Sequence, residues 1–114
     1  MKIKHIHRRR GDTDPYQIVV TDADDEPMDI TAATFVLAVN SEEEPTDATE
    51  PPQIFTSVGS IIGLAINGRV DFPISSDDAD NVGAYYYEIE MTSAAGKDKT
   101  IQGGRFIMTQ DIAK

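Results

Sequence analysis

A chain of 114 residues, 39% of them apolar, is long enough for one domain that buries about two thirds of the surface exposed by its unfolded chain. The absence of cysteine excludes disulfides, thiolate metal sites and cysteine nucleophiles. A net charge of −10 disfavours nucleic acid as a partner, and no apolar run is long enough to predict a membrane span or a signal peptide.

The basic residues are concentrated at the N-terminus. Five of the ten Lys and Arg residues lie within residues 1–10, with no acid among them. The rest of the chain carries all 20 acids against the other five bases, a balance of −15. We predict that residues 1–10 form either a basic arm or an edge strand, where lysines discourage unwanted pairing, and that residues 11–114 form the domain.

Short alternating apolar runs, separated by turn residues, predict strands and almost no helix. The expected strands cover residues 15–22, 33–40, 53–59, 61–74, 85–92 and 100–109. Within residues 61–74, Asn67-Gly68 is a strong signal for a hairpin turn. Residues 40–52 are acidic and contain proline, which predicts a long surface loop, and residues 75–81 could form one helical turn capped by Ser75 or Ser76.

Three consecutive tyrosines begin one of these strands. Tyr85 and Tyr87 share a face with Ile89 and Met91, whereas Tyr86 shares the other face with Glu88 and Glu90. We therefore expect Tyr85 and Tyr87 to point inward. Gly83-x-Tyr85 is also typical of the corner of an immunoglobulin-like sandwich, where a tyrosine hydroxyl binds nearby backbone. The predicted core comprises Val20, Phe35, Leu37, Phe72, Tyr85, Tyr87, Ile89 and Phe106.

The pattern as a whole predicts an all-β protein, an antiparallel immunoglobulin-like β-sandwich of about seven or eight strands. Gly103-Gly104, within the last expected strand, indicates either a β-bulge or a close approach of another backbone segment.

Residues that could carry chemistry are few. His5 and His7 lie on one face of a strand, but two imidazoles alone make a weak metal site. Residues 22–26 mimic the start of a calcium loop, yet Pro27 occupies the position that needs glycine. A looser calcium site between this turn and residues 77–80 stays open. We predict no catalytic, cofactor-binding or metal-binding residues.

Two stretches, residues 8–39 and 67–112, resemble the small Ig-like domains of tailed-bacteriophage virion proteins, in particular the N-terminal domain of baseplate upper proteins. The shared motifs are Gly11-Asp12-Thr13, Asp22 to Pro27, Ile30-Thr31, Gly68-Arg69-Val70, Gly83 to Ile89 and Thr100 to Phe106. The basic N-terminus and the length of the acidic loop depart from the family's pattern. No long assembly region follows Lys114, so we expect a small free-standing component.

The resemblance implies a non-enzymatic structural component of a tailed-phage or prophage virion, such as a tail, baseplate or capsid-associated protein. It would be made in the cytoplasm of the bacterial host and located in the virion. Its expected partners are other virion proteins and further copies of itself, with no nucleic acid, membrane or cofactor. The residues predicted to contact partners are Lys4, Arg8, Arg9, Arg10 and Tyr86.

An alternative function is an Ig-like module that binds carbohydrate or a cell surface. Such a module needs exposed aromatic side chains. The chain has no tryptophan, and its candidate aromatic residues are Tyr16, Phe35, Phe55 and Tyr86.

Overall fold

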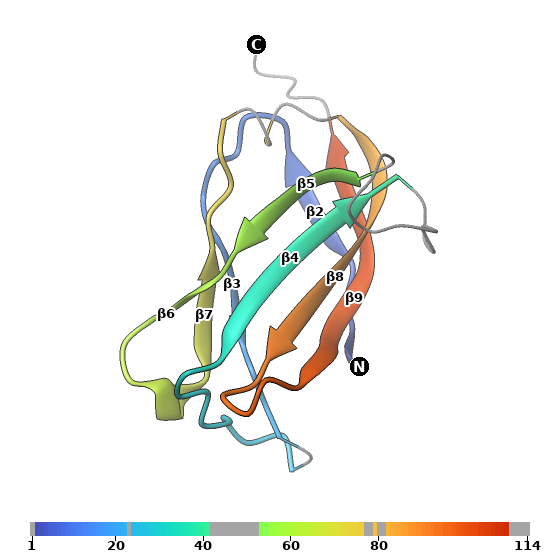
Figure 1. The fold of residues 1–114 in the computed structure, drawn as a ribbon. Coiled ribbons are helices and arrows are strands. Elements are labelled where there is room, and N and C mark those ends of the chain that lie inside the picture. The colour runs from blue at the N-terminus through green and yellow to red at the C-terminus, as the bar shows by residue number, and fades with distance from the viewer. Residues whose placement is uncertain (1, 23, 42–52, 77–78, 80–81, 110–114) are drawn as a thin grey trace.

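The computed structural model describes residues 2–22, 24–41, 53–76, 79 and 82–109, whose strands form two sheets (Figure 1). The larger sheet has six strands: β1 (Lys2–Ile3), β2 (Ile6–Arg9), β4 (Thr34–Asn40), β5 (Gln53–Val58), β8 (Gly83–Thr92) and β9 (Asp98–Thr109). The smaller has three: β3 (Tyr16–Val19), β6 (Ser60–Ile61) and β7 (Arg69–Phe72). A short 3-10 helix, η1 (Ala65–Asn67), precedes β7. The predicted all-β, sandwich-like architecture is confirmed.

The direction of the first strands differs from the prediction. The larger sheet has the order β1-β9-β8-β4-β5, and β2 also pairs with β9. Both β1 and β2 run parallel to β9, with Lys2 opposite Gln102 and Arg9 opposite Thr109. The expectation of a wholly antiparallel fold was therefore wrong. No tight turn joins β2 to β9, so the local sequence does not fix their relative direction.

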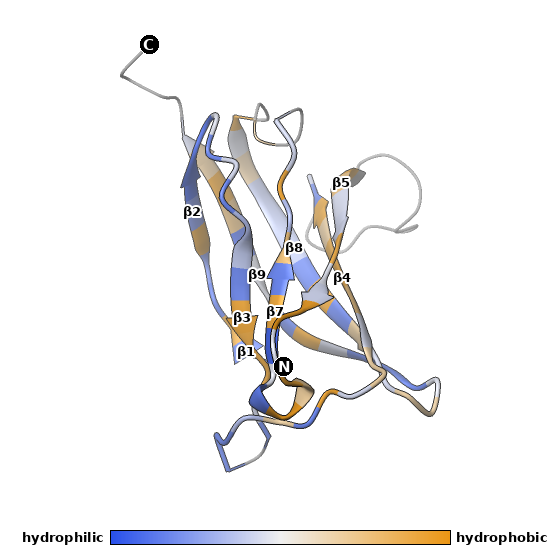
Figure 2. Ribbon diagram, turned by 90° about the vertical axis from the view of Figure 1, so that its left-hand side faces the viewer, coloured by the Kyte–Doolittle hydropathy of each residue, from blue (hydrophilic) through white to orange (hydrophobic). Residues whose placement is uncertain are grey.

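Apolar and polar residues alternate along the strands, which places the apolar core between the two sheets. Figure 2 shows hydrophobic and hydrophilic residues alternating along several strands. The buried side chains of the core include Val20, Phe35, Leu37, Val39, Val70, Phe72, Tyr87, Ile89, Phe106 and Met108. Seven of the eight predicted core residues are buried; the eighth, Tyr85, is half-buried and packs against the core.

Tyr85 forms the predicted corner at the start of β8. Its hydroxyl donates a hydrogen bond to the backbone oxygen of Val82 at 2.9 Å. Gly83 has a φ of 149°, and a Cβ added there would lie 3.0 Å from the Tyr85 ring and hydroxyl. Glycine is therefore favoured at this position both by its backbone conformation and by the close tyrosine.

Asn67-Gly68 does not form a two-residue hairpin. The strands β6 and β7 are antiparallel, with Ile61 opposite Val70, but the connection between them contains η1. Gly68 ends η1 in a left-handed conformation with a φ of 67°. Its oxygen accepts a hydrogen bond from the N–H of Val20 at 2.7 Å, so this glycine fastens the turn to the chain after β3.

Gly104 allows the N-terminal segment to approach β9 closely. Its φ is 154°, and a Cβ added there would lie 2.6 Å from the backbone oxygen of Lys4. The register shift between β8 and β9 lies elsewhere, between Ile89 and Glu90. Ile89 pairs with Gln102 and Glu90 pairs with Thr100, so Ile101 is left without a partner on β8. Of the two explanations for Gly103-Gly104, close backbone approach is therefore the one observed.

Two predicted connections fall largely outside the described residues: most of the acidic loop, at 42–52, and residues 77–78 and 80–81 of the expected helical turn. Within the second, Ala79 is fully buried and its N–H donates to the oxygen of Ser75 at 2.9 Å. No helix in the described part of the chain has the length and apolar character needed to cross a bilayer.

Candidate protein-interaction surface

The N-terminal segment is fastened to the body of the protein by Tyr87. The Tyr87 hydroxyl donates a hydrogen bond to the backbone oxygen of Lys4 at 2.6 Å and accepts one from Nε2 of Gln102 at 2.8 Å. The same Gln102 nitrogen donates to the hydroxyl of Tyr16 at 3.0 Å. This chain of hydrogen bonds links the first strands, the smaller sheet and β9 across the interior.

Burial changes the acidity of the Tyr87 hydroxyl. Desolvation is the main cause that raises the pKa of this phenol well above its ordinary value, because a buried phenolate would lose its hydration. The hydrogen bond from Gln102 acts in the opposite direction but is weaker. Tyr87 is therefore a neutral structural hydrogen-bonding group.

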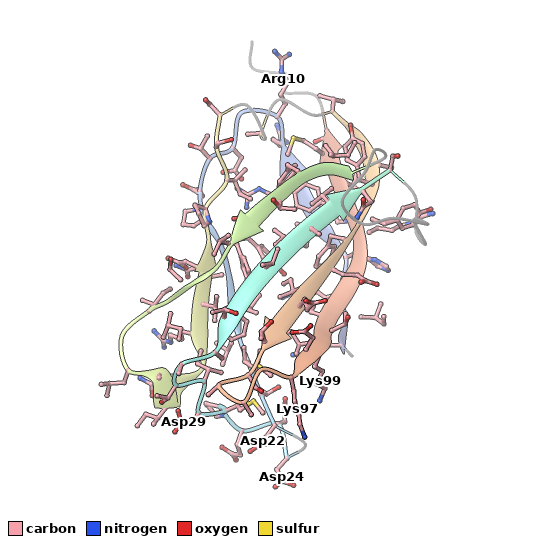
Figure 3. All side chains as sticks on the ribbon, viewed as in Figure 1. Arg10, Asp22, Asp24, Asp29, Lys97 and Lys99 are labelled. Atoms are coloured by element: carbon pink, nitrogen blue, oxygen red, sulfur yellow. The ribbon has the colours of Figure 1, made fainter. Side chains whose placement is uncertain are left out.

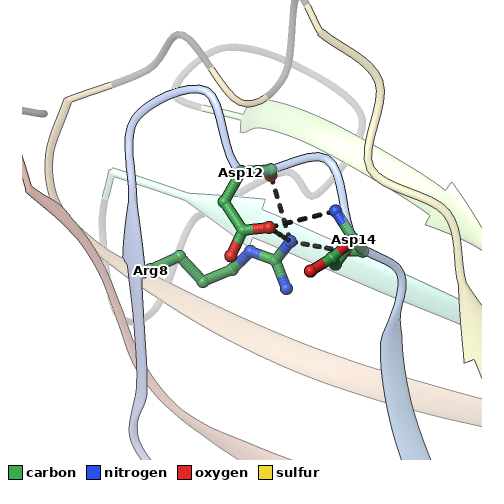
Figure 4. Close-up of polar contacts among 3 residues, drawn as sticks. All are labelled: Arg8, Asp12 and Asp14. Atoms are coloured by element: carbon green, nitrogen blue, oxygen red, sulfur yellow. Dashed lines mark hydrogen bonds and ion pairs between the residues drawn. The ribbon is translucent and has the colours of Figure 1, made fainter. Parts of the chain in front are cut away.

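Arg8 points into its own domain. Its guanidinium donates to the backbone oxygen of Asp12 at 3.0 Å and to that of Asp14, and it lies 3.3 Å from the Asp12 carboxylate (Figure 4). The Asp12 carboxylate also accepts a hydrogen bond from the N–H of Asp14 at 3.0 Å. The Arg8 side chain is only 8% exposed, so it closes the turn after β2 within the same chain.

Two of the predicted partner-binding residues, Arg9 and Tyr86, lie on the outer face of the larger sheet. His7 and Arg9 alternate with the inward residues of β2 and are exposed. Arg105 is exposed on β9 and pairs with the half-buried Tyr86 on β8. With His5, which is exposed between β1 and β2, these residues form a surface that we call the basic face: His5, His7, Arg9, Tyr86 and Arg105.

Lys4 and Arg10 lie beside the basic face rather than on it. Lys4 is exposed in the short break between β1 and β2, and its N–H donates to the oxygen of Gly103 at 2.9 Å. Arg10 follows β2 and donates its N–H to Thr109 at 2.8 Å. Figure 3 places Arg10 at the end of the molecule opposite Asp22 and Asp24.

The basic face adjoins an acidic strip. Glu88 and Glu90 follow Tyr86 on the outer face of β8, and both are exposed. Sequence reasoning identified Arg9 and Tyr86 but missed Arg105. The outward alternation of β9 could have indicated Arg105, but its position beside Tyr86 required the register of β8 and β9.

Two of the residues considered for metals, His5 and Asp22, accept hydrogen bonds from the backbone. The N–H of Arg105 donates to Nδ1 of His5 at 3.0 Å. The Asp22 carboxylate accepts hydrogen bonds from the N–H groups of Asp24 and Glu26 at 2.9 and 3.1 Å, which closes the turn. Across the described ranges, no three His, Asp or Glu side chains gather around a position that could hold a metal ion.

The described part of the residue 75–81 segment lies far from this turn. The N–H of Gly11 donates to the oxygen of Ala79 at 2.9 Å, beside Arg10 and at the other end of the molecule from Asp22 (Figure 3). The carboxylates predicted to share a calcium site with this turn, at positions 77, 78 and 80, lie outside the described residues. Near the Asp22 turn, Asp29 has a lowered pKa because the hydroxyl and N–H of Thr31 both donate to its carboxylate.

The aromatic residues offer little surface for stacking on a sugar. Phe35 and Phe55 are buried at 1% and 7% exposure. Tyr16 is half-buried and its hydroxyl accepts the hydrogen bond from Gln102. Of the four candidates, only Tyr86 combines partial exposure with an outward position on the larger sheet.

No protein-family model matches the chain, and no curated protein sequence is similar to it. Its fold is similar to that of the N-terminal domain of phage TP901-1 ORF48, with a TM-score of 0.57 and 13% sequence identity. The match covers 93% of this chain and 85% of that one. ORF48 is a baseplate upper protein, so the resemblance drawn from the sequence is confirmed for the fold: this chain is folded like the N-terminal domain of a phage baseplate upper protein.

Proposed function

We propose that this protein is a structural, non-enzymatic component of a tailed-phage or prophage virion that acts through protein–protein contacts. The observation that supports it is the fold match to the TP901-1 ORF48 domain over 93% of the chain. The shared motifs of a Gly-Asp-Thr opening and a Gly-x-Tyr-x-Tyr strand support the same assignment from the sequence. The proposal includes a place in the tail or baseplate. It also includes an immunoglobulin-like topology for the sandwich.

We assign the partner contact to the basic face. The face gathers two arginines and two histidines, whereas the chain as a whole has a net charge of −10. Its basic character therefore contrasts with that of the protein as a whole. Tyr86 adds an amphipathic ring next to Arg105, a combination that is enriched in protein interfaces. The complementary partner is an acidic surface, either on another virion protein or on a neighbouring copy of this one.

Localisation is the first test of the virion role. Particles purified from the host strain are labelled with an antibody against this protein and viewed by negative-stain electron microscopy. Label at a fixed position on the particle is the expected result. Purified particles that lack the protein, while the infected or induced cell contains it, would contradict the virion role.

Charge reversal is the test of the basic face. Deletion of residues 1–10 is unsuitable, because it would remove two strands and the buried Ile6. The double variant Arg9→Glu and Arg105→Glu should instead fold normally and enter particles less efficiently. Wild-type incorporation should fall as salt rises, since the screening length is about 10 Å at about 0.1 M. The matched control is Lys97→Glu, an exposed lysine at the other end of the sheet (Figure 3).

The two tests separate the general proposal from the specific one. If the folded double variant enters particles as well as wild type at every salt concentration, the basic face is not the contact, although the virion role stands. If the control is impaired equally, the effect reflects net charge and not this face.

A further inference from the structure

A groove lies where the open sides of the two sheets meet, with a volume of about 340 Å³. One wall comes from β1 and β9 and the other from β3 and the turn that follows it, segments that lie side by side in Figure 2. Its floor is apolar and includes Ile18, Met28, Met91 and Ile101. The groove is separate from the basic face, because its floor residues include the inward-facing Met91 and Ile18.

Both walls contain strand edges without a strand partner. The short β1 covers only Gln102 and Gly103 of β9. Residues 98–101 of β9 therefore have no strand beside them on that side in the described part of the chain. Likewise β3 pairs with β7 alone among the described strands. Edge strands of this kind present main-chain N–H and C=O groups on which an extended peptide can add a further strand.

The rim of the groove is positively charged. Lys2 and Lys99 both line it and are exposed, and neither forms an ion pair with any residue that the structure describes. Among the described residues of the lining, the only carboxylate is that of Asp22, and it accepts the two backbone hydrogen bonds that close its own turn. Two ammonium groups thus face solvent around an apolar floor, on a chain that is acidic overall.

We propose that this groove binds an extended segment of a partner protein that carries both acidic and apolar residues on the one face turned towards the groove. The segment would lie along residues 98–101 of β9, seat apolar side chains over Ile101 and Met28, and place carboxylates near Lys2 and Lys99. The strand edges favour a peptide over a small anionic amphiphile, since only a peptide can use their hydrogen-bonding groups. The inference rests on the proposed virion role only in naming the partner as a virion protein.

The experiment uses the isolated protein, two short synthetic peptides and, as a small anionic amphiphile, decanoate. One peptide carries glutamate and valine at successive positions of the face turned towards the groove, with serine at the alternate positions, and the other carries lysine in place of glutamate. Amide chemical shifts and amide hydrogen exchange are followed by NMR during titration. The glutamate peptide should shift and protect residues 98–101 and should shift residues 18–22, whereas the lysine peptide should bind at least about tenfold more weakly.

Variants test the charge requirement. The double variant Lys2→Glu and Lys99→Glu should reverse the preference between the two peptides. Lys97→Glu is the matched control, because Lys97 is exposed in the adjacent turn but does not line the groove, and it should bind as wild type does. If the double variant melts at a lower temperature than wild type, the single variant Lys99→Gln is used instead. It should weaken binding of the glutamate peptide without reversing the preference between the two peptides.

Three results would overturn the proposal. They are the absence of shifts with either peptide, equal binding of both peptides, and binding of decanoate at residues 98–101 without binding of the glutamate peptide. If the peptide does not bind but the protein enters particles normally, the proposed role of the groove is wrong and the virion role stands. Peptide binding by a protein that is absent from particles would support the groove and contradict the virion role.

Discussion

Replacing Tyr87 by phenylalanine removes one oxygen atom and leaves the buried ring in place. The lost hydroxyl donates to the oxygen of Lys4 at 2.6 Å and accepts from Gln102 at 2.8 Å. The Tyr87 side chain is only 2% exposed, so water has little access to the space that the hydroxyl would leave and could not readily replace either hydrogen bond. Gln102 keeps its other hydrogen bond, to Tyr16, which limits the loss.

The expected cost of Tyr87→Phe is about 2 kcal/mol. A buried polar group left without its partner costs roughly 1–3 kcal/mol, and two partners are affected, although one of them retains a second bond. Tyr85→Phe is the matched control. Its hydroxyl donates to Val82 in an exposed hydrogen bond, where water can take its place, so we expect a cost of about 0.5 kcal/mol.

Urea denaturation measures both costs, and unchanged slopes would show that the unfolded states are comparable. For a domain of this size, 2 kcal/mol corresponds to a fall in Tm of roughly 8 °C. Equal destabilisation by the two substitutions, or no loss with Tyr87→Phe, would refute the reasoning. It would mean that the Tyr87 hydroxyl does not hold the N-terminal segment against the sheet.

Three further outcomes are expected. Phe72→Ala should destabilise the fold by about 3–5 kcal/mol in urea denaturation, because Phe72 is fully buried; a loss below about 1 kcal/mol would contradict that packing. Gly104→Ala should lower Tm well below that of Gly96→Ala, since both glycines have a positive φ but only the new Cβ at residue 104 meets Lys4, and equal Tm values would argue against the close approach. Above about pH 10 the unfolded state loses the Tyr87 proton while the native state keeps it, so wild-type stability should fall with rising pH more steeply than that of Tyr87→Phe; parallel curves would contradict the raised pKa.

The long strands could be predicted from the sequence because their alternation is local. The runs at 33–40, 85–92 and 100–109 correspond to β4, β8 and β9 within two residues at each end. The inward position of Tyr87 followed from counting alternate positions, and the corner formed by Tyr85 followed from the Gly83-x-Tyr85 motif. These features depend on residues within one strand, so a single sequence is enough to specify them.

The features that the sequence could not specify depend on residues far apart in the chain. Arg8 is an exception: its partners Asp12 and Asp14 are close in the chain, and its inward turn depends on the conformation of the loop that contains them. The parallel direction of β1 and the place of Arg105 beside Tyr86 depend on strand register. The groove combines a gap in the coverage of β9 with the free edge of β3, and neither has a local signature.

The parallel pairing of the first and last strands has a consequence for the order in which the protein can fold. Lys2 pairs with a residue 100 positions further along the chain, and Arg9 pairs with Thr109 in the same register. A ribosome adding about 5–20 residues per second needs on the order of 5–20 s to make the partner of the first strand. During that interval the basic N-terminal segment has no place in the larger sheet, so closing of this edge must be among the last steps of folding.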